Sequence, residues 1–227
     1  IAQFISTSID FLVYKDNSNR YESLNKRYKN EKQVSKLLKK AKRLAVTIEG
    51  KRDYALLALI ATCGLRTIEI ERADKADLSF KGDIHILYIQ GKGRSDKSDY
   101  VKLSSEVYSI LEDYLFERRD SNEALFVTHQ KGKESTRLLT QNIRRIIKEL
   151  LRRIGIDDPH YSTHSLRHSF ATNLIKNGMS LEQAKVLLRH KDLSTTMIYV
   201  HGIERDTNNG ELIMSDLLFG GKNRDGK

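Results

Sequence analysis

The chain has 227 residues, which is enough for one or two domains with a buried core. Its 40 Lys and Arg residues against 30 Asp and Glu residues give a formal net charge of +10, which favours a polyanionic partner, nucleic acid first among them. The one cysteine, Cys63, excludes an internal disulfide framework and a multi-cysteine zinc site, and it is typical of a reducing compartment, so we expect a cytoplasmic protein.

The first segment is expected to be the end of an N-terminal domain. The chain starts at Ile1 without a signal-peptide pattern, so we expect a fragment of a longer protein. Phe4 to Val13 is typical of the end of a helix, which we interpret as the last element of an N-terminal domain.

Positive charge is concentrated in the segment that follows. Between Arg20 and Arg52, twelve Lys and Arg residues stand against three Glu residues, an excess of nine. This segment is either an ordinary solvated helix face or a linker or helix that follows DNA phosphates without reading sequence. We favour the second interpretation, and the candidate DNA-binding residues are Lys36, Lys39, Lys40, Lys42 and Arg43.

The middle of the chain predicts a buried helix and then a small sheet. Apolar residues lie almost all round a helix from Asp53 to Cys63, whose apolar run is about half of the ~20 residues that a membrane span requires. Gly64 is suited to end this helix, and a short helix over Thr67 to Ala73 follows. Strands are expected near Leu78, over Ile84 to Gln90 and over Tyr100 to Leu103, which places Lys92 where a hairpin begins to turn.

The second half is predicted to be helical. The expected helices cover Ser105 to Arg119, Thr140 to Ile154 with Thr140 as its cap, Thr163 to Asn177 with Thr163 as its cap, a helix after a Ser180 and Gln183 capping box, and a short helix from Ser194 or Thr195 that holds Tyr199. The outer face of the helix after Thr140 carries Arg144, Lys148 and Arg152, which suits a DNA groove and a plain amphipathic helix equally. We therefore expect an α+β fold that is mainly α, with a small three-stranded antiparallel sheet.

Four residues could bind an anion together. His164 and Arg167 are three apart on one helix, so both can address one small anion such as phosphate. Arg66 directly follows a Gly-Leu pair at the start of a helix, where backbone amides also favour an anion, and Glu69 can hold its guanidinium in place. His190 ends the next predicted helix. Taken singly, each of these residues is more often structural, and only their joint order and spacing points to a site.

These residues carry a resemblance to a known family. THSLRHSFATNLIKNGMSLEQAKVLLRHKDLSTTMIYVHG, from Thr163 to Gly202, resembles the C-terminal signature of the tyrosine recombinases, which include phage integrases and Xer-type resolvases. CGLRTIEIERADKADL resembles the family's first-arginine box, and GKGR at Gly91 to Arg94 resembles its hairpin lysine. The resemblance spans about Glu31 to Gly202 and implies the helical catalytic fold of that family.

The resemblance also implies a chemistry and a set of roles. Arg66, Lys92, His164, Arg167, His190 and Tyr199 occupy the family's six active-site positions. Tyr199 is expected to be the nucleophile that forms a 3′-phosphotyrosyl linkage, with Arg66 and Arg167 binding the phosphate and with no metal or ATP required. Lys92 is expected to protonate the leaving 5′ oxygen, His164 to assist proton transfer and His190 to hold a phosphate oxygen. The implied partner is double-stranded DNA in the nucleoid, bound by a homotetramer whose subunits are monomers in solution.

The resemblance divides the chain into three parts. Residues 1–30 are expected to be a remnant of a core-DNA-binding domain with its basic linker, and residues 31–205 the catalytic domain. Residues 206–227 form a tail that either docks on a neighbouring subunit or caps its own core. Arg189 stands where the family commonly has glycine, so its turn is made by a residue with a Cβ, and its guanidinium is a candidate phosphate contact.

Three other interpretations compete with the resemblance. His164 and His168 could ligate zinc, but the glutamate of a zinc protease is missing and Arg167 between them would repel the cation. A non-catalytic DNA-binding module explains the charge but leaves the ordered six residues as coincidence. A type IB topoisomerase shares the chemistry but acts as a monomer, which gives it no use for a docking tail.

Overall fold

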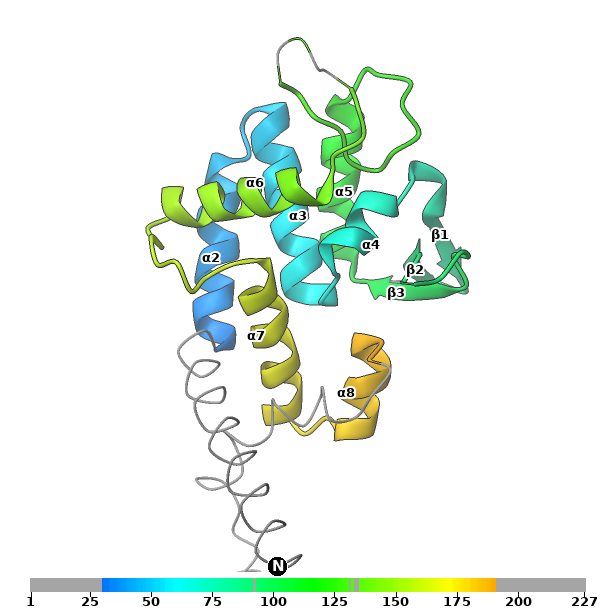
Figure 1. Cartoon of the computed structure of the whole chain (residues 1–227), viewed down its shortest axis with the longest axis vertical. Coiled ribbons are helices and arrows are strands. Elements are labelled where there is room, and N and C mark those ends of the chain that lie inside the picture. Colours follow the sequence, from blue (N-terminus) through cyan, green and yellow to red (C-terminus); the bar gives the residue numbers. More distant parts are fainter. Residues whose placement is uncertain (1–29, 92, 131, 133–134, 191–227) are drawn as a thin grey trace, which may run out of the picture.

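The computed structural model describes residues 30–190 except 92, 131, 133 and 134, and several of its helices pack around one central helix (Figure 1). The expected Phe4 to Val13 helix, the helix holding Tyr199 and the tail over 206–227 lie outside the described residues. The described elements, in chain order, are α2 (Glu31–Leu44), α3 (Ile48–Cys63), α4 (Thr67–Arg72), the 3-10 helix η1 (Lys75–Asp77), β1 (Leu78–Lys81), β2 (Ile84–Ile89), β3 (Asp99–Leu103), α5 (Ser105–Glu117), α6 (Thr140–Arg153), α7 (Thr163–Lys176) and α8 (Leu181–Leu188).

The three strands form one antiparallel sheet, as predicted. β2 lies in the middle, with Leu78 of β1 opposite Leu87 and Val101 of β3 on its other side. Leu87, Ile89 and Val101 are buried, so one face of the sheet packs on the helical core. The mainly helical α+β class expected from the sequence is confirmed.

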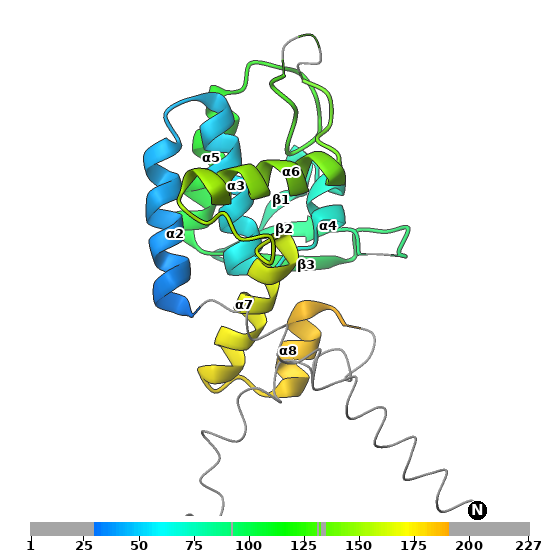
Figure 2. The same ribbon diagram turned by 60° about the vertical axis from the view of Figure 1, so that its left-hand side comes forward.

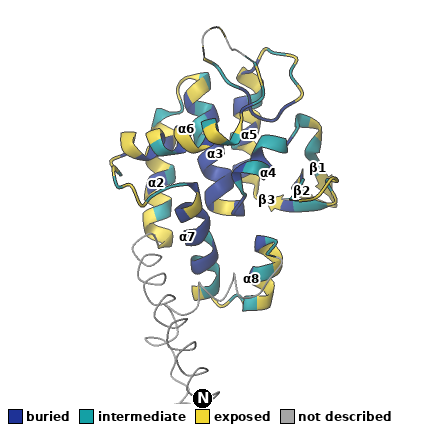
Figure 3. Ribbon diagram, viewed as in Figure 1, coloured by how far each residue is buried: buried dark blue, intermediate teal, exposed yellow. Residues whose placement is uncertain are grey.

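Helix α3 is the centre of the core, and Figure 3 shows it buried along most of its length. It begins at Ile48, five residues before the predicted start at Asp53, and Thr47 caps it by accepting from the amide of Gly50. A Cβ on Gly50 would lie 2.2 Å from the carbonyl oxygen of Leu44, so glycine lets α2 and α3 approach closely there. The polar sequence of this first turn hides the true start of the helix.

Two of the predicted caps are wrong by one residue. Thr140 is the first residue of α6 and Leu139 its cap, because the carboxylate of Glu71 accepts from the amide of Thr140. Ser162, rather than Thr163, caps α7. Its amide donates to the hydroxyl of Ser165, which in turn donates to the carbonyl of Ser162. The capping box of Ser180 and Gln183 at α8 is confirmed.

The junction after α3 brings two distant segments together. Gly64 ends α3 with φ +59°, a left-handed conformation that glycine adopts without strain. A Cβ at this position would lie 2.4 Å from the ring of Phe170 on α7. Glycine is therefore required here both by its backbone angle and by the close approach of α7.

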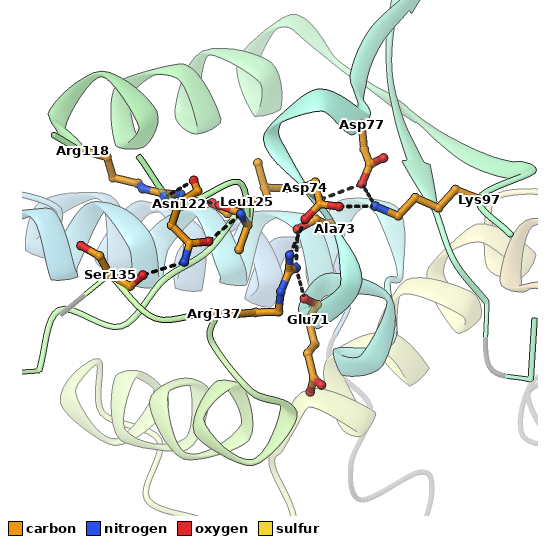
Figure 4. Close-up of polar contacts among 11 residues, drawn as sticks. Glu71, Ala73, Asp74, Asp77, Lys97, Arg118, Asn122, Leu125, Ser135 and Arg137 are labelled. Carbon is orange, nitrogen blue, oxygen red and sulfur yellow. Dashed lines mark hydrogen bonds and ion pairs between the residues drawn. The ribbon is translucent and has the colours of Figure 1, made fainter. Parts of the chain in front are cut away.

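A polar network fixes the loop after α4 (Figure 4). Lys97, from the connection between β2 and β3, donates to Asp74 at 2.6 Å and to Asp77 at 2.5 Å. Arg137 donates to Asp74 and to the backbone carbonyls of Glu71 and Ala73. Although desolvation raises it, the pKa of Asp74 is held below its usual value by these hydrogen bonds from Lys97 and Arg137. The network ties the sheet hairpin and the segment before α6 to the end of α4.

Among the described residues, no helix has both the length and the apolar character of a membrane span.

Candidate active site

Arg66 lies between the end of α3 and the start of α4, where two partners hold it. Its Nη1 donates to Glu69 Oε1 at 2.9 Å, and its backbone amide donates to Glu69 Oε2 at 2.8 Å. Its Nη2 donates to the backbone carbonyl of Arg189 at 3.2 Å, across 123 residues of chain. The Arg66 side chain is 25% exposed, whereas that of Glu69 is fully buried. The expected contact between Glu69 and Arg66 is present, and the supporting role of Glu69 stays a prediction.

Arg167 reaches the same place from α7. It is buried, and its guanidinium donates to the backbone carbonyls of Gly64 and Leu188. These two carbonyls stand at the ends of α3 and α8, so Arg167 joins three helices at one point. Figure 2 shows α7 descending from the core toward α8.

His190 follows α8 and faces Arg167. Its Nε2 lies 3.4 Å from Nη2 of Arg167. Because arginine has only donors, this contact fits a neutral imidazole with Nε2 as the acceptor and the proton on Nδ1. Desolvation and the positive charges of Arg167, Arg66 and Arg189 lower the pKa of His190 to about 4. At neutral pH His190 is therefore uncharged and suited to hydrogen bonding.

His164 lies in the first turn of α7 and is exposed, whereas its neighbours Thr163 and Ser165 are buried. Desolvation, followed by the charges of Arg144, Arg167 and Arg66, lowers its pKa below the usual value. A histidine with a lowered pKa is neutral at physiological pH and can accept a proton. The charge of Arg144 on α6 is therefore close enough to His164 to lower its pKa.

The structure thus gathers arginine side chains from three segments around one buried carboxylate, that of Glu69. Arg66, Arg167 and Arg189 all act on Glu69, and together they outweigh its single negative charge. A concentration of guanidinium groups with neutral imidazoles beside them suits the binding of a phosphate group. Two of the six predicted active-site residues, Lys92 and Tyr199, lie outside the described residues.

Two residues that the sequence analysis does not single out support the hairpin next to Lys92. Arg72 of α4 donates from Nη1 to the carbonyl oxygen of Gly91 at 3.2 Å. Lys97 anchors the other side of the hairpin to Asp74 and Asp77. No local pattern marks these contacts, because each joins residues about 20 positions apart through the fold.

The predicted DNA-binding residues fall into two groups. Lys36, Lys39, Lys42 and Arg43 are exposed on α2. Lys40 is also exposed, but its Nζ donates to the carbonyl of Ile154 at 2.8 Å, and the half-buried Lys148 donates to the carbonyls of Asp158 and Tyr161. Arg152 pairs with Glu149 on the exposed face of α6.

Within residues 30–190, apart from the four positions not described, no group of three or more His, Cys, Asp or Glu residues is placed to hold a metal ion.

Comparison with known proteins places the chain in a family. The model of the phage integrase family matches residues 27–205. The chain belongs to the phage integrase family. Tyrosine recombinase XerD of Listeria monocytogenes serotype 4b is 36% identical over 159 residues, which cover 67% of this chain and 50% of that relative. This phage integrase family member spans about half the length of the curated relatives it matches.

Solved structures agree on the fold of this phage integrase family member. The XerA recombinase matches with a TM-score of 0.64 and 25% identity, over 84% of this chain and 64% of that one. The XerH site-specific recombinase, in its post-cleavage complex with palindromic difH substrate, matches with a TM-score of 0.64 and 25% identity, over 84% of this chain and 53% of that one. The tyrosine-recombinase catalytic fold implied by the sequence resemblance is therefore confirmed.

Proposed function

We propose that this chain is the catalytic part of a site-specific DNA recombinase that cleaves and rejoins strands through a 3′-phosphotyrosyl intermediate. The observation that carries the proposal is the meeting of Arg66, His164, Arg167 and His190 in one cationic cluster, although they come from segments about 100 residues apart. The relatives that share the family are tyrosine recombinases, and XerH was solved with its DNA substrate.

In the proposed reaction the phosphate lies between Arg66 and Arg167. Each guanidinium binds a non-bridging oxygen and stabilises the charge that develops there, and losing one such donor typically costs about 10²–10³ in rate. The phenolic oxygen of Tyr199 attacks phosphorus, the bond to the 5′ oxygen breaks, and Lys92 gives that oxygen its proton. His164 accepts the phenolic proton, and neutral His190 bonds a phosphate oxygen. Bond energy is kept in the new ester, so religation needs no ATP.

Tyr199 is within reach of the cluster along the chain. Tyr199 is nine positions after His190, and an extended chain of that length spans up to about 30 Å. We propose that residues 31–205 form the catalytic domain, that residues 1–30 belong to a DNA-binding domain and its linker, and that residues 206–227 dock on a neighbouring subunit in a DNA-bound tetramer. From this activity we also propose that the protein acts at the nucleoid in the cytoplasm.

The test is covalent capture of DNA. The chain is incubated with a library of randomised nicked duplexes, in which a short fragment diffuses away after cleavage and traps the adduct. We expect an SDS-stable protein–DNA adduct that forms equally well in EDTA, and sequencing of the trapped strands should reveal a preferred site. The absence of any adduct would support a non-catalytic DNA-binding module instead.

The exposed lysines of α2 predict a salt-dependent part of DNA binding. Replacing Lys36 and Lys39 together by glutamine should weaken binding to all duplexes and reduce the slope of log K against log salt by about 2. Titration of a fluorescent duplex at several salt concentrations measures this slope. Lys51→Gln is the matched control, because Lys51 already pairs with Asp113 and Glu117 and should leave the slope unchanged. An unchanged slope in the double variant would show that Lys36 and Lys39 of α2 do not contact DNA phosphates.

A further inference from the structure

Arg189 adopts a backbone conformation that arginine disfavours. It is the C-cap of α8, with φ +56° and ψ +43°, in the left-handed region. A residue with a Cβ is strained there, and glycine would adopt the same angles freely. A strained backbone conformation is kept only where surrounding contacts hold the residue in it. The contacts of the Arg189 side chain and carbonyl show what holds it.

The guanidinium of Arg189 is turned into the protein. Its Nε donates to Glu69 Oε1 at 3.1 Å and its Nη2 to Glu69 Oε2 at 2.8 Å, an arrangement that occupies both carboxylate oxygens. Its Nη1 donates to the carbonyl of Leu187 at 2.8 Å. The side chain is only 9% exposed. Its Nε, Nη1 and Nη2 all donate to other groups of the protein.

The same residue also contacts Arg66 through its backbone. The carbonyl oxygen of Arg189 accepts from Nη2 of Arg66, while Glu69 accepts from Nη1 of Arg66. Arg66, Glu69 and Arg189 therefore form a closed ring of contacts, in which both terminal nitrogens of Arg66 are held by groups that Arg189 provides or orients. Glu69 is fully buried, and a buried carboxylate is stable as an anion only when it is well paired.

We propose that Arg189 is a positioning residue that fixes the guanidinium of Arg66 toward the scissile phosphate, through Glu69 and through its own carbonyl. This inference rests on the proposed recombinase function. It replaces a direct phosphate contact of Arg189 with an action through another residue, and it gives a reason for arginine at a left-handed position. Misplacing a catalytic group by a small distance slows a reaction without weakening substrate binding.

The test separates cleavage from binding. Arg189→Gly removes the guanidinium and relieves the backbone strain, and it should slow single-turnover cleavage of the captured nicked duplex about 10-fold or more, while the Kd for that duplex changes by no more than about twofold. Arg189→Lys keeps the charge but contacts the carboxylate at one point, so its cleavage rate should be intermediate. Arg119→Ala, at an exposed arginine outside the site, should cleave like the unchanged chain.

A second measurement asks whether Arg189 acts through Glu69. On a Glu69→Gln background, adding Arg189→Gly should slow cleavage much less than it does alone, because the paired residues are no longer independent. Thermal unfolding is followed for every variant. If Arg189→Gly fails to fold, the cleavage rate of Arg189→Lys is the test of the inference. Wild-type cleavage by both Arg189 variants, or a defect confined to Kd, would overturn the inference.

Arg66→Ala separates this inference from the proposed function. If Arg66→Ala cleaves at the unchanged rate, the proposed function is wrong. If Arg66→Ala is inactive while the Arg189 variants cleave normally, the recombinase function stands and the positioning role of Arg189 is wrong.

Discussion

Replacing Tyr199 by phenylalanine should abolish the covalent adduct completely while leaving duplex affinity unchanged. The substitution removes one oxygen atom, and that oxygen is the proposed nucleophile, so no ester to phosphorus can form. The remaining ring preserves the shape of the side chain. Denaturing gels of the nicked-duplex reaction measure the adduct, and a gel-shift titration measures affinity.

Tyr161→Phe is the matched control for this experiment. Tyr161 lies two residues before the start of α7 and is half-buried, so it offers the phenol nearest in sequence to His164 among the described residues. Its variant should form the adduct as the unchanged chain does. Digestion of the adduct and mass spectrometry of the DNA-linked peptide should locate the bond at Tyr199. An adduct that persists in Tyr199→Phe would show that another residue is the nucleophile.

The elements of the fold are largely predictable from the sequence, because helical and strand periodicity are local. Apolar residues that recur about every 3.6 positions identify α5 and α6, and capping residues identify α7. A run of β-branched and aromatic residues followed by glycines identifies the sheet. The start of α3 escapes this reasoning because its first turn contains Gly50 and charged residues. That glycine is required by contact with Leu44, a packing relation that periodicity does not reveal.

The candidate site could be named from the sequence, but its contacts could not. The order and spacing of Arg66, His164, Arg167 and His190, together with the family resemblance, single out these four residues as candidates. The pairing of Arg189 with Glu69 joins residues 120 positions apart, and the same arginine looks like a DNA contact from its charge alone. Lys40 and Lys148 show the same limit, because a lysine that bonds a backbone carbonyl and a lysine that faces DNA look alike in sequence.

Replacing Arg167 by alanine should damage both the reaction and the fold. Losing its donor to the transition state should slow cleavage by about 10²–10³. The carbonyls of Gly64 and Leu188 lose the donor that joins α3 and α8, which should lower the free energy of unfolding by about 1–3 kcal/mol. Single-turnover cleavage at saturating DNA and urea unfolding measure the two effects separately.

Arg66→Ala is the comparison that separates the loss of cleavage from the loss of stability. Arg66 carries the same charge but is partly exposed, and Glu69 keeps its bidentate contact with Arg189 when Arg66 is removed. Its variant should therefore lose cleavage to a similar extent with a smaller loss of stability. If Arg167→Ala, studied at a temperature where it is folded, cleaves as fast as the unchanged chain, Arg167 holds helices together and does not bind the reacting phosphate.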